Sequence, residues 1–391
     1  MVNEAPKDIV ILGAGVAGIR AALDLEKKID SRTGRIVLVD ENDYHQYLYK
    51  IQEVCNKEYE EKDIVVPISR LIEGKGIDFV KTSVKNVSLE RHVVETTGGE
   101  ISYDILVIAL GSHVTYFGIE GLQENSVTLS SFEAAKEIRS RIEELFKEAE
   151  KTRVPPNIVV GGGGFTGVEL AGEIADWYPI LCREHNIEKP QYYVSIVEMM
   201  PTILSGWDED LVLKGQVVLN EIGVQLVLND AVKRVSENRI ELKSGRTLEP
   251  DLFIWNGGVH GDPACGSAFE IKGRRISIDE YCRAEGHDSI YVAGDSACAT
   301  NSEGHPLPPT AHIAMVHGEL VARNIISSLR GEPLRPYVHK RIGEIVTLGR
   351  TYAIGDLYGL KFTGALAKFM KKVVHWWYLY SIGGFGLLLG S

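Results

Sequence analysis

The sequence has few cysteines and no pair of them at redox spacing. Its five cysteines are Cys55, Cys182, Cys265, Cys282 and Cys298, and none of them forms a CxxC or CxxxxC motif. This odd, scattered set argues against a disulfide framework, and no His, Cys or carboxylate cluster has metal-ligand spacing. We therefore predict a reducing compartment and no metal site.

Positive charge is also scarce. The chain has 42 Lys and Arg against 54 Asp and Glu, a formal net charge of −12. This balance excludes nucleic acid as a partner, because a phosphate backbone is held by clustered cations. The C-terminal segment differs: no acidic residue follows Asp356, and four lysines give the last 35 residues a charge of about +4.

Long apolar runs are absent as well. No segment reaches the roughly 18 apolar residues needed to cross a bilayer. The N-terminal MVNEAPKD lacks the basic start and the cleavage site of a signal peptide. We expect an intracellular protein that is soluble or lies on a membrane surface, and 391 residues predict two or three domains.

A glycine-rich corner near the N-terminus has every part of a dinucleotide-binding fingerprint. A strand leads into Gly13, Gly15 and Gly18 at GxGxxG spacing, a helix follows to about Lys28, and a second strand ends at Asp40. Glycines permit a tight turn and close approach of a pyrophosphate, the helix N-terminus attracts its charge, and the acid accepts ribose hydroxyls. The corner predicts a first nucleotide site.

A second corner repeats the pattern in IVVGGGGFTGVELAGEIAD, residues 158–176. Gly162, Gly164 and Gly167 have the same spacing, a helix runs to about Leu181, and the next strand ends at Glu198. A carboxylate at that strand end binds a ribose 2′-hydroxyl and repels a 2′-phosphate. Two fingerprints predict two nucleotide sites, and the second favours NADH over NADPH.

Two further passages look like one structural position in related domains. They are YDILVIALGS at 103–112 and PDLFIWNGG at 250–258. A third apolar strand at 289–293 leads into Gly294 and Asp295, where a carboxylate at a strand end suits a sugar or ribityl hydroxyl, although a purely structural Gly-Asp remains an alternative. The predicted fold class is α/β, with two Rossmann-like dinucleotide-binding domains.

These motifs, in this order, resemble the flavoproteins with two dinucleotide-binding domains. Within that superfamily the chain resembles the type II NADH:quinone oxidoreductases, which are single-subunit NADH dehydrogenases that do not pump protons. The segments that carry this resemblance are NDYH (42–45), GFTGVE (164–169), FIWNGGV (253–259), PPTA (308–311) and YLYSIGG (378–384).

The resemblance implies FAD as cofactor and NADH as substrate. It assigns FAD to Gly13, Gly15, Gly18, Asp40, Gly111, Gly294, Asp295 and Ala311. It assigns NADH to Gly162, Gly164, Gly167, Glu198, Gly257 and Gly258. The expected division is an FAD-binding domain at 1–117 and 276–335, an NADH-binding domain at 118–275, and a membrane-anchoring region at 336–391.

The quinone site departs from the family pattern. The family usually shows AQxAxQ after PPT, and here His312 and Val316 stand where the two glutamines are expected. Those glutamines line the quinone headgroup pocket in the family, so the departure puts the quinone, or its use as acceptor, in doubt. The partners implied are NADH, a membrane quinone, the membrane surface and a second copy in a homodimer, at the cytoplasmic face of the cell membrane.

The C-terminal tail has the pattern of an amphipathic helix. One side carries Leu366, Phe369, Met370, Val373, Trp376 and Trp377, and the other carries Lys368, Lys371, Lys372 and His375. A basic face, an aromatic apolar face and a short length predict an interfacial helix whose lysines meet anionic lipid. The alternative is an apolar face that packs on the protein itself or on a partner subunit.

Glu169 lies just beyond Gly167, early in the second glycine helix. It either stabilises the helix N-terminus or, as the resemblance implies, reaches toward nicotinamide and flavin. We predict that Glu169 is catalytic together with Lys371 and Lys372, and we interpret Glu173 and Asp176 as a solvated face.

Two other functions stay open. One is a sulfide:quinone oxidoreductase, which needs paired cysteines that only Cys55, Cys182 and Cys298 would supply. The other is a non-enzymatic, NADH-binding redox sensor.

Overall fold

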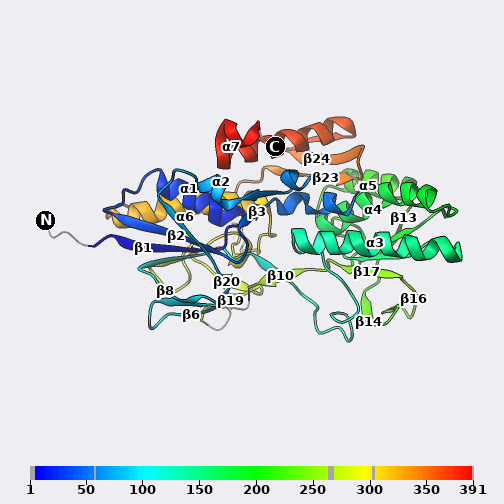
Figure 1. Cartoon of the computed structure of the whole chain (residues 1–391), viewed down its shortest axis with the longest axis horizontal. Coiled ribbons are helices and arrows are strands. Elements are labelled where there is room, and N and C mark those ends of the chain that lie inside the picture. Colours follow the sequence, from blue (N-terminus) through cyan, green and yellow to red (C-terminus); the bar gives the residue numbers. More distant parts are fainter. Residues whose placement is uncertain (1–4, 57–58, 263–267, 302–303, 390–391) are drawn as a thin grey trace.

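The computed structural model describes residues 5–56, 59–262, 268–301 and 304–389, and it is built on two parallel β-sheets. The first has the strand order β21-β9-β1-β2-β5 and the second β13-β12-β11-β17. Figure 1 shows the two sheets at opposite ends of the longest axis. The strands of the first sheet are β1 (Lys7–Leu12), β2 (Gly34–Asp40), β5 (Ile77–Lys81), β9 (Ile105–Ile108) and β21 (Ile290–Val292). Those of the second are β11 (Ile158–Gly161), β12 (Val194–Val197), β13 (Val224–Val227) and β17 (Leu252–Trp255).

The two sheets repeat one arrangement, which confirms the predicted fold class. In each, the strand before the glycine corner pairs in parallel with the strand that follows the helix, β1 with β2 and β11 with β12. On its other side β1 pairs with β9 and β11 with β17, so YDILVIALGS and PDLFIWNGG occupy the same position, as predicted. The strands are apolar runs because helices or small sheets cover both of their faces.

The helices are longer or shorter than the sequence predicts by a few residues at their ends. The helix of the first corner ends at Glu26 and that of the second reaches Glu184. The helices are α1 (Val16–Glu26), α2 (Ile68–Ile72), α3 (Phe132–Thr152), α4 (Phe165–Glu184), α5 (Glu209–Glu221), α6 (Ala311–Leu329) and α7 (Ala365–Leu388). The short 3₁₀ helices named below are η1 (Leu48–Cys55) and η4 (Gly294–Ser296).

Small sheets complete the two halves and join them. β10 (Ser112–Val114) and β18 (Val259–Gly261) form an antiparallel ladder between the halves. The others are β3 (Tyr44–Gln46) with β4 (Val65–Pro67), β6 (Val84–Ser88) with β7 (Val93–Thr96) and β8 (Gly99–Ser102), β14 (Val232–Ser236) with β15 (Arg239–Leu242) and β16 (Thr247–Leu248), and β19 (Ile271–Lys272) with β20 (Arg275–Ser277) and β22 (Ala297–Cys298). The chain thus leaves the first half after β9 and returns to it at β21.

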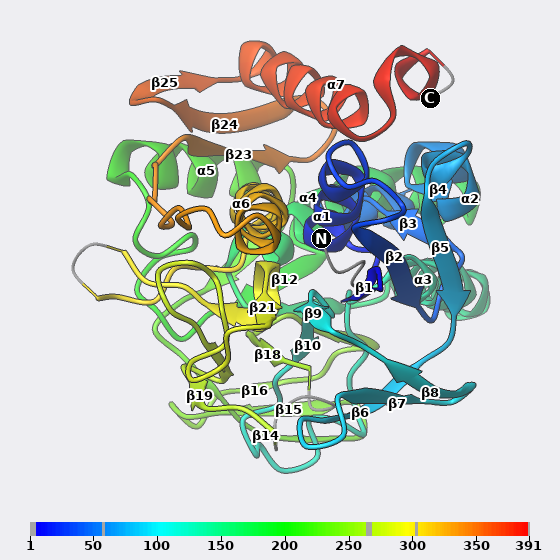
Figure 2. The same cartoon turned by 90° about the vertical axis from the view of Figure 1, so that its left-hand side faces the viewer.

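The C-terminal part forms a layer over both halves. β23 (Gly343–Leu348), β24 (Tyr352–Leu357) and β25 (Leu360–Thr363) make an antiparallel sheet, and α7 lies beside it along the upper edge (Figures 1 and 2). Some α7 side chains are buried against the body, namely Ala367, Tyr378, Leu379, Ile382 and Leu387. Within the described residues, no helix has both the length and the apolar character needed to cross a membrane.

Candidate functional site

The first glycine corner is shaped for a ligand at one glycine and for the fold at the other two. Gly13 has φ of +95°, and a Cβ on it would lie 2.3 Å from the Ala109 carbonyl oxygen. A Cβ on Gly18 would lie 1.8 Å from the Gly13 carbonyl oxygen, whereas a Cβ on Gly15 meets nothing within 4 Å. The turn and the close packing of α1 therefore require Gly13 and Gly18, while Gly15 faces open space where a pyrophosphate can approach the backbone.

The second corner has the same geometry. Gly162 has φ of +105°, and a Cβ on Gly167 would lie 2.0 Å from the Gly162 carbonyl oxygen. Gly164 again faces open space. Both corners thus present a helix N-terminus and an uncovered backbone, the features that bind a nucleotide pyrophosphate.

The two strand-end carboxylates also match each other. Asp40 Oδ2 accepts a hydrogen bond of 2.6 Å from the Ala14 N–H, and Glu198 Oε2 accepts one of 2.6 Å from the Gly163 N–H. Burial raises the pKa of Asp40, although backbone hydrogen bonds from Ala14 and Asn42 oppose it. Each acid therefore lies against the middle of its glycine loop, where ribose hydroxyls of a bound dinucleotide would be placed.

The remaining residues predicted for FAD gather at the carboxyl end of the first sheet. Gly294 has φ of +66°, and a Cβ on it would lie 3.2 Å from the Cβ of Ala17 in α1. Asp295 Oδ2 accepts a hydrogen bond of 3.2 Å from Ser112 Oγ, and burial raises the pKa of this carboxyl. Ser296 Oγ donates to the Gly111 carbonyl oxygen at 3.1 Å.

Ala311 is the first residue of α6, and Thr310 caps this helix by accepting a hydrogen bond from the Ile313 N–H. The Thr310 side chain bonds one of the first N–H groups of α6, so the others give this helix end a positive potential.

Gly257 and Gly258 follow β17 in the second half. A Cβ on Gly257 would lie 2.1 Å from Cζ2 of Trp255, whose Nε1 donates to the Thr115 carbonyl oxygen at 2.8 Å. Gly258 has φ of +149° and faces the ring of Phe117. Gly257 is needed because Trp255 fills the space beside it, and Gly258 because of its positive φ and the nearby Phe117 ring.

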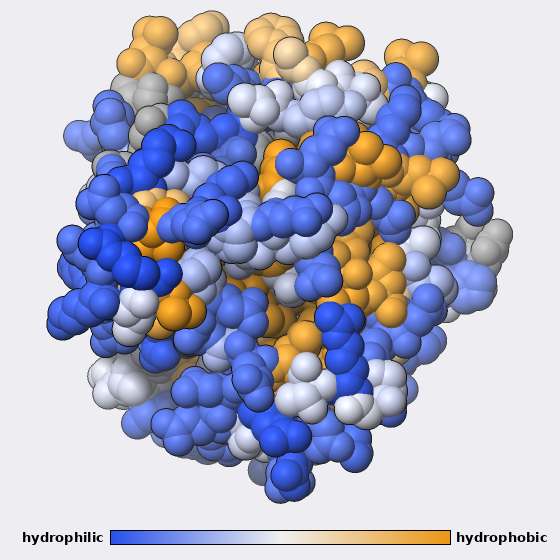
Figure 3. Space-filling model, turned by 90° about the vertical axis from the view of Figure 1, so that its right-hand side faces the viewer, coloured by the Kyte–Doolittle hydropathy of each residue, from blue (hydrophilic) through white to orange (hydrophobic). Residues whose placement is uncertain are grey.

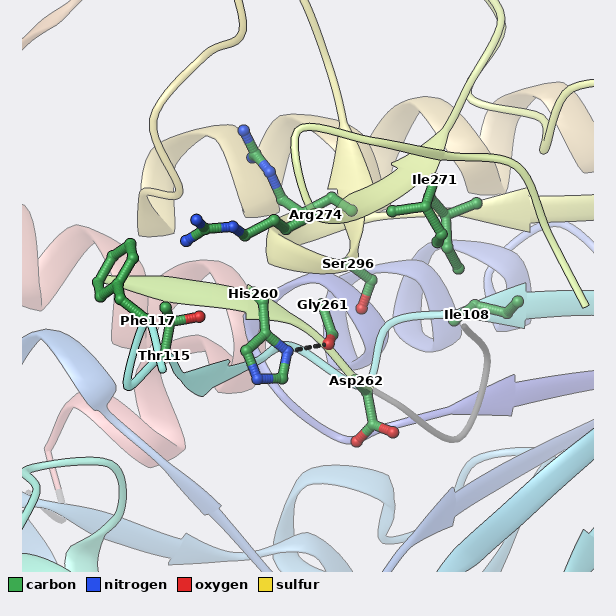
Figure 4. A pocket seen from close by; sticks show the side chains of 11 residues that line it. Ile108, Thr115, Phe117, His260, Gly261, Asp262, Ile271, Arg274 and Ser296 are labelled. Atoms are coloured by element: carbon green, nitrogen blue, oxygen red, sulfur yellow. Dashed lines mark hydrogen bonds between the residues drawn. The ribbon is translucent and has the colours of Figure 1, made fainter. Parts of the chain in front are cut away.

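A cavity of about 540 Å³ lies at the junction of the two halves, a feature that the sequence did not indicate. Figure 4 shows Phe117 and Thr115 at one end and Ile108 and Ile271 at the other. The Arg274 guanidinium lies 4.6 Å from the centre of the Phe117 ring, and both residues line the cavity.

Glu169 lies at the meeting point of four elements. Its side chain is buried, with 7% of the residue exposed. Oε1 accepts hydrogen bonds of 2.8 Å from both the backbone N–H and Oγ1 of Thr347 in β23, and it also binds Lys371 Nζ from α7. Oε2 accepts one of 3.1 Å from Gln52 Nε2 in η1. The structure therefore brings the predicted pair Glu169 and Lys371 into direct contact.

Three comparisons place this geometry among known proteins. The family model described as pyridine nucleotide-disulphide oxidoreductase matches residues 7–318. A type II NADH:quinone oxidoreductase of Staphylococcus saprophyticus is 31% identical over 97% of this chain and 97% of its own length.

The chain belongs to the type II NADH:quinone oxidoreductases.

Solved structures share the fold of this family member. NDH2 of Plasmodium falciparum in complex with NADH superposes with a TM-score of 0.83 at 16% identity, covering 98% of this chain and 97% of the other. The sulfide:quinone oxidoreductase of Aquifex aeolicus gives 0.79 at 20% identity, covering 96% and 91%.

The remaining predicted site residues of this type II oxidoreductase lie apart from Glu169. Lys372 is exposed on α7, and within the described ranges no hydrogen bond or ion pair joins it to Glu169. His312 and Val316 lie partly exposed in the first turns of α6. Burial lowers the pKa of His312, and nearby His339 lowers it further. Only one of the two predicted lysines therefore reaches the carboxylate.

The orientation predicted for two of the tail lysines, Lys371 and Lys368, is wrong, whereas Lys372 is exposed as expected. Lys371 points inward to Glu169, and Lys368 Nζ donates to the Gly349 carbonyl oxygen at 3.2 Å. His375 Nδ1 lies 2.8 Å from Tyr49 Oη. Lys371, Lys368 and His375 therefore face the protein, where the buried Glu169 carboxylate needs a cationic donor.

The large residues predicted for the apolar side of α7 are exposed, so they do not pack on the protein's own body, whereas Met370 and Val373 on the same side are partly buried. Phe369 is 53% exposed, Trp376 46% and Trp377 55%, and Leu366 is also exposed.

Sequence reasoning missed a buried aromatic network that joins α7 to the first glycine corner. His45 Nδ1 lies 2.7 Å from the Ala14 carbonyl oxygen, and its Nε2 lies 2.8 Å from Tyr378 Oη. Burial lowers the pKa of His45 to about 4, and that of His375 to about 4, so both rings are neutral near pH 7. Alternating aromatics in NDYHQYLY were the only signal in the sequence, and they do not indicate a partner more than 300 residues away.

The interpretation of Glu173 and Asp176 as a solvated face is also wrong. Glu173 is only 3% exposed, and Asp176 is partly buried and accepts a hydrogen bond from the Arg350 N–H. The reason is that β23 and α7 cover this side of α4.

The cysteines do not support sulfide chemistry. Cys55, Cys182, Cys282 and Cys298 are buried and unpaired, while Cys265 lies outside the described residues. Burial raises the pKa of Cys182 to about 11, and it raises the pKa of Cys55 further. The thiols of Cys182 and Cys55 therefore stay protonated near pH 7, whereas the nucleophilic form is the thiolate.

Proposed function

We propose that this protein oxidises NADH, using FAD to pass two electrons to a membrane quinone. The observation that carries the proposal is the combination of two complete nucleotide corners with the Glu169 and Lys371 pair beneath a helix that is apolar on its outer side. In the division we propose, residues 1–117 and 276–335 hold FAD, 118–275 hold NADH, and 336–391 meet the membrane.

The first corner fits FAD. Gly15 leaves the backbone open to a pyrophosphate, and Asp40 can exchange its bond to the Ala14 N–H for a ribose hydroxyl. Asp295, partly buried in η4 just after β21, is placed to accept a ribityl hydroxyl in place of Ser112. Bound FAD supplies the chemistry that side chains lack, since it accepts a hydride and releases electrons.

The second corner fits NADH. Gly164 leaves space for the pyrophosphate, and Glu198 is placed to accept the ribose 2′-hydroxyl. A 2′-phosphate there would meet the carboxylate charge at short range, so we propose NADH as the physiological donor.

Glu169 and Lys371 are the residues we assign to the quinone side. A quinone reduced to a quinol takes up two protons, and a buried carboxylate with a paired ammonium can hold and orient a proton at this position. His312 and Val316, in place of the expected glutamines, offer one polar and one apolar side chain to the headgroup.

The outward face of α7 supports attachment to a membrane. Figure 3 shows hydrophobic side chains along the upper edge, the side of the molecule on which α7 and β25 lie in Figure 2. Exposed Trp and Phe side chains favour the headgroup region of a bilayer. We propose a peripheral protein at the cytoplasmic face, and the homodimer stays a prediction.

Anaerobic titration of the purified flavoprotein tests the function. NADH should bleach the flavin absorption. A short-chain quinone should then restore it at a rate at least equal to the steady-state turnover rate. Bleaching by sulfide but not by NADH would support the sulfide enzyme instead. Bleaching by NADH without reoxidation by quinones would instead support a redox sensor.

Liposome sedimentation tests the membrane face. The double variant Trp376→Ser, Trp377→Ser should lose most of its binding while keeping FAD. The matched control is Val154→Ser, Tyr192→Ser, which removes exposed apolar side chains far from α7. Truncation of α7 is a poorer experiment because it also removes the buried Tyr378. Equal binding by both double variants would contradict the proposal.

A further inference from the structure

Glu173 is a buried acid that the function proposed above does not use. It lies one helical turn beyond Glu169 on α4 and is 3% exposed. Its Oε2 accepts a hydrogen bond of 3.0 Å from Asn56 Nδ2, the one hydrogen bond to this side chain within the described part of the chain. Glu169, by contrast, has the ammonium of Lys371 and both donors of Thr347. The two acids are neighbours, but Glu169 has a cation and several hydrogen-bond donors to stabilise its negative charge, whereas Glu173 has one donor among the described residues.

The charges around Glu173 come from three elements. Glu53 and Cys55 of η1 lie near Glu173, as does Asp176 of α4 itself. Lys368 of α7 lies near it as well. Burial raises the pKa of Glu173 to about 7, the Asn56 hydrogen bond and Lys368 oppose the rise, and Glu53 and Asp176 add to it. A carboxyl with such a value gains and loses a proton readily at physiological pH.

Three acids form a line along one side of α4. Glu169, Glu173 and Asp176 are spaced by four and three residues, so they share a helix face with about 5–6 Å between successive Cβ atoms. The end of β23 closes this face tightly, since a Cβ on Gly172 would lie 3.1 Å from the Leu348 carbonyl carbon and 2.5 Å from the nitrogen of Gly349, the next residue. The line leads from buried Glu169 through Glu173 to the partly exposed Asp176.

The proton balance of the reaction requires a proton from solvent. A hydride from NADH carries two electrons and one proton, whereas a quinone takes up two electrons and two protons to become a quinol. One proton for each turnover must therefore come from water. The outer face of α7 is apolar, so a quinone that enters from that side brings no water with it.

We propose that Glu173 relays this solvent proton, taking it up from the side of Asp176 and passing it toward Glu169, from which it reaches a quinone oxygen. Glu173 gains a proton and then releases it, so its charge is restored in every cycle. This inference rests on the proposed reduction of a quinone. It makes Glu173 a residue that acts through Glu169 and not by touching the quinone.

The test separates the two half-reactions of the FAD-loaded protein. In Glu173→Gln, reoxidation of the reduced flavin by a short-chain quinone should slow at least about tenfold at pH 7 and lose the pH dependence of the wild type between pH 6 and 8. Flavin reduction by NADH, and turnover with ferricyanide, which takes electrons without protons, should stay within about twofold. Glu173→Asp should restore part of the pH dependence. The matched control is Glu221→Gln, which changes an exposed glutamate of α5.

Infrared titration provides a measurement that does not depend on turnover. The wild type should show a protonated carboxyl C=O band that disappears between pH 6 and 8, and Glu173→Gln should lack it.

Two results overturn the relay: wild-type quinone kinetics in Glu173→Gln, or an equal loss with ferricyanide, which marks a structural defect. A wild type whose reduced flavin no quinone reoxidises refutes the proposed function itself, and the relay with it.

Discussion

The burial of Glu173 predicts a pH-dependent stability difference between the wild type and Glu173→Gln. Burial raises the pKa of this carboxyl from the ordinary 4.5 to about 7. Between these values the folded state holds a proton that the unfolded state has released. The associated stability is present in full below pH 4.5 and is lost as the pH rises through 7. A glutamine of the same shape keeps the Asn56 contact and has no proton to lose.

The size of the effect follows from the shift. At about 1.4 kcal/mol per pKa unit, the wild type loses roughly 3 kcal/mol across this window relative to the variant. Unfolding entropy of about 2.1 cal/mol/K per residue gives roughly 0.8 kcal/mol/K for a chain of this length, so the loss corresponds to a Tm change of about 4 °C.

Thermal unfolding of both FAD-saturated proteins at pH 5, 6, 7 and 8 measures this difference. The Tm of Glu173→Gln minus that of the wild type should rise by about 3 °C from pH 5 to pH 8, because part of the effect is already lost at pH 5. Subtracting the two proteins at each pH removes the titration of groups that they share. A difference that stays constant with pH would refute the assignment of Glu173 as a buried acid that is neutral below pH 7.

Substitutions at Glu198, at two glycines and at Lys371 also test the site. Glu198→Ala should narrow the preference for NADH over NADPH in flavin reduction, and a wild type that uses both equally would contradict the role of Glu198. Gly15→Ala should fold but lose FAD, whereas Gly164→Ala should keep FAD and raise the KM for NADH at least about tenfold. The reason is that each added methyl group enters open space beside one corner only. The same phenotype from both variants would show that the corners are not separate sites. Lys371→Met should destabilise the protein by about 3–5 kcal/mol because it leaves Glu169 buried without its cation, and adding Glu169→Gln should recover part of the Tm loss.

The two nucleotide corners were predictable because their requirements are local. A tight turn, a close helix and a strand-end acid lie within about 30 residues, and glycine is needed wherever φ is positive or a Cβ has no room. Gly13, Gly18 and Gly167 are such positions, and the structure has them as the spacing predicts. The repeat of the motif was enough to predict two similar parallel sheets.

The amphipathic pattern of the tail was equally visible, but its orientation was not. Periodicity shows that α7 has two faces, and it does not show which of them meets protein. The answer depends on Glu169, 202 residues away, whose buried charge draws Lys371 inward.

By itself, the sequence therefore determined the nucleotide corners, the order of strands around them and the two-faced character of the C-terminal helix, because each of these depends on short-range sterics and on side-chain period. Only the tertiary structure decided which acids are buried, that β23 and α7 cover Glu169 and Glu173, and that His45 meets Tyr378. The physical reason is that desolvation and charge pairing depend on which distant segments exclude water, and a single segment of sequence does not contain that information.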